Sequence, residues 1–393
     1  MTRPLEGIRI FDLTNAAVGP IATELLAGMG ADVIKVESPE GEMMHTMVPK
    51  QRGFAAAYTS HNFNKRAIIL DLKNEADRAK AYRLLETCDV FVENFRTGVA
   101  TRLGVDYETV AGVNPRIVYV SASAWGSRGP MRALAGVDPN LQAFSGFASL
   151  NGKPGGGGEF HRGYGHIDAT TASYIAAAIL QALIHRHQTG KGTHIEIEML
   201  SAAMTVQLTR VAEYFAGGAK PIGEGSATAS SAPNQAFSCS NKKHLAVAVE
   251  TDAQWRGLCA AIREPDLETD PRFATTTARI EHRQELSERL AAVFAKRPSI
   301  WWTKELTRHG VPSSLFYDFE MLRDHAQIVD NGMLVTIDLK HQGTVMTAGY
   351  PWRFSGSEVP VLPAPAPGEH TDEVMASLEA KGQPAPAAAP RQG

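Results

Sequence analysis

Short apolar strands alternate with helices in the N-terminal part of the chain, and this alternation restricts the possible folds more than any other feature. Residues 8–13 (IRIFDL) and 32–36 (DVIKV) read as buried strands, and residues 21–29 between them read as a helix. A strand, a helix and a strand joined by short connections form parallel strands with a right-handed crossover. We therefore predict an α/β fold with a doubly wound sheet.

The same alternation continues toward residue 215. Further strands are predicted at 67–72, 90–93, 117–122 and 194–198, and further helices at 75–87, 168–187 and 201–215. The helix over 168–187 is rich in alanine, and we expect it to be buried along most of its length. Together these elements make one large α/β domain.

The composition changes after residue 215. Residues 217–232 are rich in Gly, Ala and Ser, which is typical of a loop, and a strand (244–249) and helices (254–262, 301–309) follow. We predict a large domain over 1–215, a smaller α+β domain over 216–342, a return segment to the large domain over 343–378 and a disordered tail over 379–393. The tail is rich in Pro and Ala and has few side chains to bury.

Charge and cysteine content exclude several classes of protein. A formal net charge of -3 argues against a general nucleic-acid binder. The most apolar long segment, 172–184, is too short to span a bilayer, and residues 1–13 do not resemble a secretory signal. Cys88, Cys239 and Cys259 are widely scattered, which favours neither a disulfide framework nor a zinc site. We expect a cytoplasmic protein without a membrane or nucleic-acid partner.

Several common catalytic motifs do not occur in the sequence. The first strand–helix connection is Thr14–Pro20 and does not contain GxGxxG, and the glycines Gly155–Gly158 have no Walker-type lysine after them. The sequence also contains no GxSxG and no HExxH. We therefore expect no metal and no permanently bound cofactor.

Asp168 opens the long apolar helix and has two interpretations. In the first, its carboxylate caps the helix by accepting N–H groups of Thr170 or Thr171. In the second, the helix N-terminus keeps the carboxylate ionised and supplies N–H groups for an oxyanion, so that Asp168 can attack an activated carbonyl. The residues alone leave both open.

A series of short motifs runs in order through residues 3–378. They include Gly7-Ile8-Arg9, Gly30-Ala31-Asp32, Asn64-Lys65-Arg66, Glu93-Asn94-Phe95, Gly129-Pro130, Asp168, Gly190-Lys191-Gly192 and Gly368-Glu369-His370-Thr371. In these motifs the chain resembles the class III CoA-transferases, a family that includes formyl-CoA:oxalate and carnitine CoA-transferases and the α-methylacyl-CoA racemases. The resemblance implies a Rossmann-like large domain, a small domain and an interlocked homodimer.

The resemblance also implies a reaction. Asp168 matches the catalytic aspartate of the family, which attacks an acyl-CoA thioester and forms a mixed anhydride and then an aspartyl-CoA thioester. A small carboxylic acid accepts the CoA. For coenzyme A or acyl-CoA as substrate, the family's contacts fall on Ala17, Val18, Asn94, Phe95 and Arg102, with Phe95 beside adenine and Arg102 beside a phosphate. Further basic candidates for the phosphates are Lys65, Arg66, Lys73 and Arg96.

The sequence departs from relatives in ways that affect the substrate. The racemases have Gly-His-Asp where this chain has Gly136-Val137-Asp138, and valine cannot carry a proton, so a transferase is favoured. Formyl-CoA transferase has a glutamine at the position of Ala17 and a glycine-rich flap where residues 227–233 lack glycine. We therefore expect an acid larger than oxalate or formate, such as a succinate-like dicarboxylate, with succinyl-CoA as a candidate donor. Candidates for substrate contacts are Val137, Asp138, His166 and Ser230.

Two alternatives stay open. One is an acyl-CoA isomerase, racemase or intramolecular CoA-transferase of the same family, with His166 as a replacement acid/base. The other is a CoA-binding protein without catalytic activity, against which the presence of Asp168 argues.

Overall fold

The computed structural model describes residues 3–47, 55–339, 343–357 and 359–382. They form two compact units, which we describe separately. The first contains the chain up to Phe147, His161–Ala219 and the residues from Asn331 onward, and the second contains Ala148–Phe160 and Lys220–Asp330. Residues 148–160, which the sequence interpretation placed in the large domain, thus belong to the second unit.

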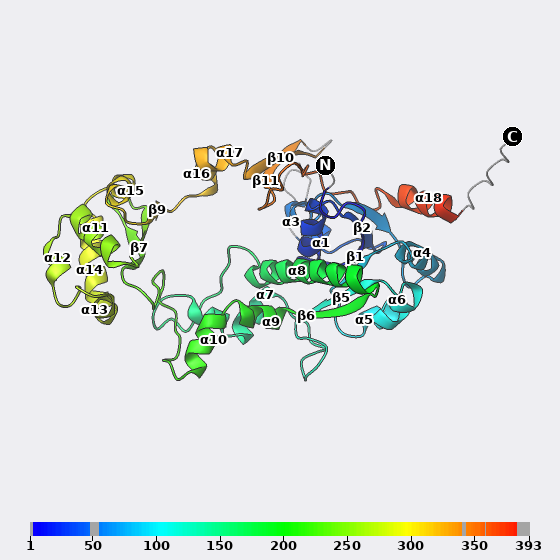
Figure 1. Ribbon diagram of the computed structural model, residues 1–393, viewed down its shortest axis with the longest axis horizontal. Helices are drawn as coiled ribbons and strands as arrows, with labels where there is room; N and C mark the ends of the chain where they lie inside the picture. The colour runs from blue at the N-terminus through cyan, green and yellow to red at the C-terminus, as the bar shows by residue number, and fades with distance from the viewer. Residues whose placement is uncertain (1–2, 48–54, 340–342, 358, 383–393) are drawn as a thin grey trace. The chain divides into compact units, whose positions relative to one another are not determined.

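A six-stranded parallel sheet organises the first unit (Figure 1). Its strands are β1 (Arg9–Leu13), β2 (Asp32–Glu37), β3 (Arg66–Ile69), β4 (Val90–Glu93), β5 (Val118–Ser123) and β6 (Thr193–Glu198). They lie in the order β3-β2-β1-β4-β5-β6, so the direction of winding reverses between β1 and β4. The predicted α/β class is confirmed.

Both faces of the sheet are buried, which explains the nearly continuous apolar runs of its central strands. On one face Ile10 and Val92 pack with residues of α1 (Val18–Gly28) and α8 (His166–Thr189). On the other face the rings of Phe11, Phe91 and Tyr119 stack in a row, with centroid distances of 5.3 and 4.6 Å. The helix α4 (Glu75–Leu85) covers this second face.

Most of the shorter helices of the first unit lie in the connections between its strands. They are α2 (Met44–Met47), α3 (Ala56–His61), α5 (Val99–Leu103), α6 (Tyr107–Val113) and α7 (Asp138–Phe144). The hairpin β10 (Leu334–Asp338) and β11 (Thr344–Ala348) and the helix α18 (Thr371–Gly382) come from the C-terminal part. Of the predicted disordered tail, residues 379–382 belong to α18, and residues 383–393 lie outside the described part of the chain.

The burial of the long helix α8 extends along most of its length, as predicted, but it is confined to one stripe. The stripe consists of Ile167, Thr171, Ala172, Ile175, Ala176, Ile179, Ala182 and Arg186. Ile184, in contrast, is 62% exposed. By length and composition alone α8 could cross a membrane, and its buried stripe packs on α1, β5 and β6.

The helix predicted over 201–215 is divided into α9 (Met199–Thr205) and α10 (Leu208–Phe215). Gln207 lies at the break: it is buried and has a non-helical backbone conformation, and its side-chain amide donates to the carbonyls of Ala203 at 2.8 Å and Ser145 at 3.3 Å. The break turns α10 so that Leu208 and Phe215 are 67% and 79% exposed.

The second unit contains an antiparallel sheet of β7 (Asn234–Ser238), β8 (His244–Ala248) and β9 (Ser313–Leu315). Its helices are α11 (Asp252–Ile262), α12 (Asp266–Thr269), α13 (Thr276–Glu281), α14 (Arg283–Phe294), α15 (Ser299–Arg308), α16 (Phe319–Arg323) and α17 (Ala326–Asp330). In its core the buried guanidinium of Arg279 lies 4.8 Å from the ring centroid of Trp255 and donates to the carbonyls of Ala232 and Phe273.

Candidate functional site

A pocket lies at the carboxyl ends of β1, β4 and β5, where the strand order reverses. Its walls are the turn after β1 (Asn15–Val18), the loop after β4 (Asn94–Arg96) and the residues at the end of β5 (Ala122–Trp125). Ligands of doubly wound sheets bind at this position, because the loops on either side of the reversal diverge there. We call it the switch-point pocket.

The pocket brings together seven of the residues singled out in the sequence. Those that line it are Ala17, Val18, Asn94, Phe95, Arg96, Val137 and Asp168. Arg102 lies on α5 with its side chain exposed, and Lys73 is an exposed side chain 4.0 Å from Glu40. Neither of these two residues is part of the pocket lining. Ser230 belongs to the second unit, so its substrate contact stays a prediction.

Asp168 does not cap α8, which corrects the first interpretation of this residue. The helix begins at His166 with Gly165 as its N-cap, so Asp168 is the third residue of the helix. The capping carboxylate comes instead from Asp138, at the start of α7. Its Oδ2 accepts the N–H groups of Ile167 at 2.7 Å and Asp168 at 3.2 Å. The carboxylate at this helix N-terminus therefore comes from a residue 30 positions upstream.

Asp168 is not held as a low-pKa carboxylate, contrary to the second interpretation. Burial and, to a smaller extent, the charge of Asp138 raise the pKa of Asp168 to about 7. The expected oxyanion donors are also occupied, because Asp138 binds the N–H groups of Ile167 and Asp168 and the Gly165 carbonyl accepts that of Ala169 at 2.9 Å. Near neutral pH, Asp168 thus exists in both protonated and ionised forms.

Gly165 sets the place of the Asp168 carboxyl group. A Cβ atom at residue 165 would lie 2.5 Å from Oδ2 of Asp168, well inside van der Waals contact. A glycine is therefore needed for the carboxyl group to fold back over the backbone at the start of α8.

The segment before α8 is fixed by a buried network around Asp138. Gln142 Nε2 donates to Asp138 Oδ1 at 2.5 Å. The same amide pairs with both backbone groups of His161, at 2.9 Å to its N–H and 3.1 Å to its carbonyl. Residues 161–168 are thus anchored at both ends, at His161 by Gln142 and at Ile167 and Asp168 by Asp138.

The turn after β1 is held by side chains from other segments. Asn94 Oδ1 accepts the N–H of Asn15 at 2.8 Å, and Asn94 Nδ2 donates to the Asn15 carbonyl at 2.7 Å. Ala16 has a φ of 63°, an uncommon value for a residue with a Cβ, and its N–H donates to Glu42 Oε1 at 2.8 Å. In the described part of the chain no side chain caps α1 at Ala17, which leaves this N-terminus uncapped at the pocket.

Lys65 and Arg66, two of the basic candidates for the phosphates, are bound by other groups of the chain. The buried Nζ of Lys65 donates to Asp12 Oδ2 at 2.9 Å, to the Pro20 carbonyl at 2.9 Å and to Asn62 Oδ1 at 2.8 Å, which uses its three hydrogens. Arg66 pairs with Asp32 and with Glu373.

His166 lies in the first turn of α8, with its ring stacked on Phe147 at a centroid distance of 5.2 Å. The ring of His161 also lies 5.2 Å away. His166 is outside the lining of the switch-point pocket as far as the described residues define it. These contacts fit a packed aromatic position better than an acid/base group.

The sequence motifs did not point to two further residues, Tyr164 and His61. The Tyr164 hydroxyl lies 2.5 Å from Nε2 of His61, which is the last residue of α3. Burial and the charge of Asp168 raise the pKa of Tyr164, so Asp168 and Tyr164 interact electrostatically. Because 103 positions separate His61 from Tyr164, no local sequence pattern predicts their contact.

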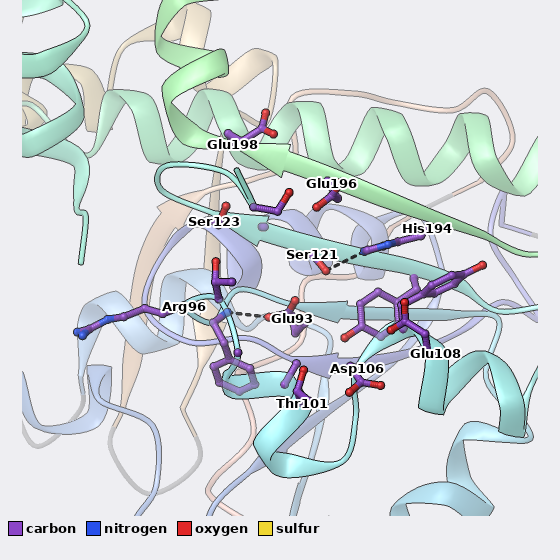
Figure 2. A pocket seen from close by; sticks show the side chains of 18 residues that line it. Glu93, Arg96, Thr101, Asp106, Glu108, Ser121, Ser123, His194, Glu196 and Glu198 are labelled. Carbon is purple, nitrogen blue, oxygen red and sulfur yellow. Dashed lines mark hydrogen bonds between the residues drawn. The ribbon is translucent and has the colours of Figure 1, made fainter. Parts of the chain in front are cut away.

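A second pocket adjoins the first along β4 and β5 and has an acidic lining (Figure 2). Its carboxylates are Glu93, Asp106, Glu108, Glu196 and Glu198. Figure 2 shows Arg96 extending away from these groups, at the edge of the pocket. Negative charge here opposes the binding of phosphates, whereas Arg96 and Arg132 line the switch-point pocket. Among the residues that the structure describes, no group of three or more His, Cys, Asp or Glu is placed to hold a metal ion.

The chain is similar to known proteins over nearly its whole length. The model of CoA-transferase family III matches residues 5–371. The succinate–glutarate CoA-transferase of Agrobacterium fabrum is 33% identical, over 96% of both chains, and the succinyl-CoA:glutarate CoA-transferase of Mus musculus is 31% identical, over 95% of this chain and 86% of the mouse protein. The crystal structure of a CAIB/BAIF family protein from Brucella suis has a TM-score of 0.86 at 32% identity, covering 96% of this chain and 100% of that one. The chain therefore belongs to the class III CoA-transferase family.

Proposed function

We propose that the protein transfers CoA from an acyl-CoA thioester to a carboxylic acid, with Asp168 as the nucleophile. The observation that carries the proposal is the place of the Asp168 carboxyl group, in the wall of a pocket whose other walls are the turn after β1 and the loop after β4. These two segments are the ones that the family resemblance assigns to CoA.

The reaction proceeds through two enzyme-bound intermediates. The Asp168 carboxylate attacks the thioester carbonyl of the donor, which gives a mixed anhydride and free CoA thiolate. The thiolate attacks the aspartyl carbonyl, which releases the donor acid and leaves an aspartyl-CoA thioester. The carboxylate of the acceptor acid displaces the thiolate to form a second anhydride, and the thiolate then attacks its acyl carbonyl, which yields the new acyl-CoA and restores Asp168.

The burial that raises the pKa of Asp168 also favours this chemistry. A less polar surrounding disfavours the charged carboxylate, whereas the anhydride and the thioester at the same position are neutral. The free energies of the intermediates are thereby brought closer to that of the resting enzyme. Exclusion of water also protects both intermediates from hydrolysis.

For CoA we propose contacts along the walls of the switch-point pocket. The uncapped N-terminus of α1 at Ala17 and Val18 offers N–H groups, and Phe95 offers an apolar surface for adenine. Arg96 is a cation within reach of the phosphates. Arg102 and Lys73, on the exposed surface, are further candidates. Asn94 acts through the backbone of Asn15, because both atoms of its amide are bound there.

We propose a short dicarboxylic acid, such as succinate or glutarate, as the acyl group. The two relatives described above are a succinate–glutarate and a succinyl-CoA:glutarate CoA-transferase. The pocket that Asp168 lines also contains Leu134, Val137 and Met199, which suit a methylene chain, and Arg132, which suits a second carboxylate.

We also propose the interlocked homodimer of the family. Ile184 on α8 and Leu208 and Phe215 on α10 are 62%, 67% and 79% exposed in the single chain. Large apolar side chains exposed in this way mark surfaces that a partner covers. Light scattering on the purified protein should give twice the mass of one chain, and a monomer would contradict the dimer.

The test of the function is a transfer assay. The protein is incubated with succinyl-CoA and glutarate, and glutaryl-CoA is measured by liquid chromatography and mass spectrometry. Transfer by the wild type and its loss in Asp168→Asn are expected, because the amide is a poor nucleophile. An Asp168→Asn variant that transfers CoA at the wild-type rate would refute the proposal.

A further inference from the structure

Tyr164, four residues before the nucleophile, contacts His61, and neither residue takes part in the chemistry above. Tyr164 stands in the segment before α8, one residue before the N-cap Gly165. His61 is only 4% exposed, whereas Tyr164 is half exposed. Their contact, 2.5 Å from the Tyr164 hydroxyl to His61 Nε2, links the nucleophile's segment to the end of α3.

The direction of this hydrogen bond follows from the surroundings of the two groups. Burial lowers the pKa of His61 to about 4, so its ring is neutral near pH 7. Burial and the charges of Asp168 and Asp138 raise the pKa of Tyr164, so its hydroxyl keeps its proton. The hydroxyl therefore donates to Nε2, and the ring proton of His61 resides on Nδ1.

The Nδ1 atom of His61 in turn faces the turn after β1. It lies 3.4 Å from the carbonyl oxygen of Ala16, the residue with positive φ in the wall of the switch-point pocket. The N–H of the same residue is bound by Glu42. Two buried side chains thus bind Ala16 from both sides, which is how an unfavourable backbone conformation is maintained.

Tyr164 lies midway between the anchors of the nucleophile's segment. Gln142 holds His161 and Asp138 holds the N–H groups of Ile167 and Asp168. Between these anchors, the hydrogen bond to His61 holds Tyr164, the residue before Gly165. Because Gly165 lies against Asp168 Oδ2, a shift of this backbone moves the carboxyl group.

We propose that His61 and Tyr164 form a positioning pair that couples the turn after β1 to the nucleophile Asp168. The inference rests on the proposed function, in which that turn contacts CoA. His61 is bound to the turn through Ala16 and to the nucleophile's segment through Tyr164. The pair keeps the carboxyl group at the distance and angle that attack on the thioester requires. Neither residue touches the reacting atoms.

The test is a double-mutant cycle on the full-length protein. His61→Leu, Tyr164→Phe and the double variant are mixed with succinyl-CoA, and the rate at which Asp168 is acylated in a single turnover is measured by trapping and mass spectrometry. Each single variant should lose about 10- to 100-fold in this rate, because small misplacements of reacting groups cost that much. The Kd for CoA should change by less than about 2-fold in Tyr164→Phe, because this variant leaves the contact of His61 with Ala16 in place. The double variant should be no slower than the slower single variant.

Two further variants separate positioning from a general effect on the fold. His61→Gln keeps an acceptor for the Tyr164 hydroxyl and a donor for the Ala16 carbonyl, and should recover part of the rate. Tyr174→Phe removes a hydroxyl from α8 and should react like the wild type. If His61→Leu does not fold, Tyr164→Phe and His61→Gln decide the question.

The outcomes are distinguishable from a failure of the function itself. Wild-type rates in Tyr164→Phe, or losses that multiply in the double variant, would overturn the positioning pair while the transferase stands. Absence of both acylation and CoA transfer in the wild type would overturn the proposed function and this inference with it.

Discussion

The pH dependence of the nucleophile follows from two causes, and Asp138→Asn separates them. The pKa of Asp168 is raised from 3.8 to about 7, by burial first and by the charge of Asp138 second. Since the rise is about 3 pH units and Asp138 supplies the smaller part, removing its charge should lower the pKa by at most about 1.5 units. Burial keeps the pKa above its usual range even then.

The attacking form is the carboxylate, so the rate of acylation should fall as the pH drops through the pKa of Asp168. At about pH 6 the wild type is roughly one tenth ionised, and the variant should be up to roughly three quarters ionised. Relative to its own plateau at high pH, Asp138→Asn should therefore react up to about 8-fold faster than the wild type at this pH. The assay is the single-turnover acylation of Asp168 by succinyl-CoA between about pH 5 and pH 9.

The plateau itself should drop in Asp138→Asn, because the new amide faces the amide of Gln142 and disturbs its pairing with His161. Gln142→Leu is the matched control: it disturbs the same pairing but keeps the charge of Asp138, so its midpoint should stay near that of the wild type. A midpoint in Asp138→Asn that is unchanged, or that rises, would refute the electrostatic explanation.

Three more variants test the site. Asp168→Asn should be more stable than the wild type at about pH 8, by about 1–3 kcal/mol after allowance for partial exposure, and equally stable near pH 4. The reason is that the raised pKa of Asp168 in the folded protein makes the stability of the wild type fall as the pH rises from about 4 to 7. Thermal unfolding at both pH values checks this. Gly165→Ala should reduce transfer at least about 10-fold because its Cβ displaces the carboxyl group, whereas Gly163→Ala, whose Cβ meets nothing nearer than 3.5 Å, should be active. Asn94→Ala should weaken CoA binding in calorimetry and cost about 1–3 kcal/mol of stability, because the Asn15 N–H loses its partner. Unchanged affinity and stability would contradict the role of Asn94 in holding the turn after β1.

The sheet was predictable because buried parallel strands leave a strong signal. Both faces of β1 and β4 are covered, so their sequences are apolar runs bounded by turns. The second unit was harder. The strand β7 has one buried residue, Phe237, and its sequence NQAFS resembles the loop before it. The helix α14, however, places Leu286, Leu290 and Val293 at helical spacing, a pattern that was present in the sequence and overlooked.

The candidate site was predictable as far as a motif could carry it. The resemblance pointed to Asp168, although the residues around it fitted a simple cap equally well. The cap is in fact Asp138, and the approach of these two carboxyl groups depends on the packing of α7 against α8. A raised pKa and a contact such as that of His61 with Tyr164 arise from segments far apart in the sequence, so local patterns do not contain them.

The most direct test of the central claim is the fate of oxygen from the acceptor acid. In the proposed reaction, the acceptor carboxylate leaves one of its oxygen atoms on Asp168 when the thiolate attacks the second anhydride. After a single turnover with succinyl-CoA and heavy-oxygen-labelled glutarate in ordinary water, mass spectrometry of the peptide that contains Asp168 should show one heavy oxygen in that side chain. Transfer of CoA to glutarate without any label in Asp168 would contradict the account.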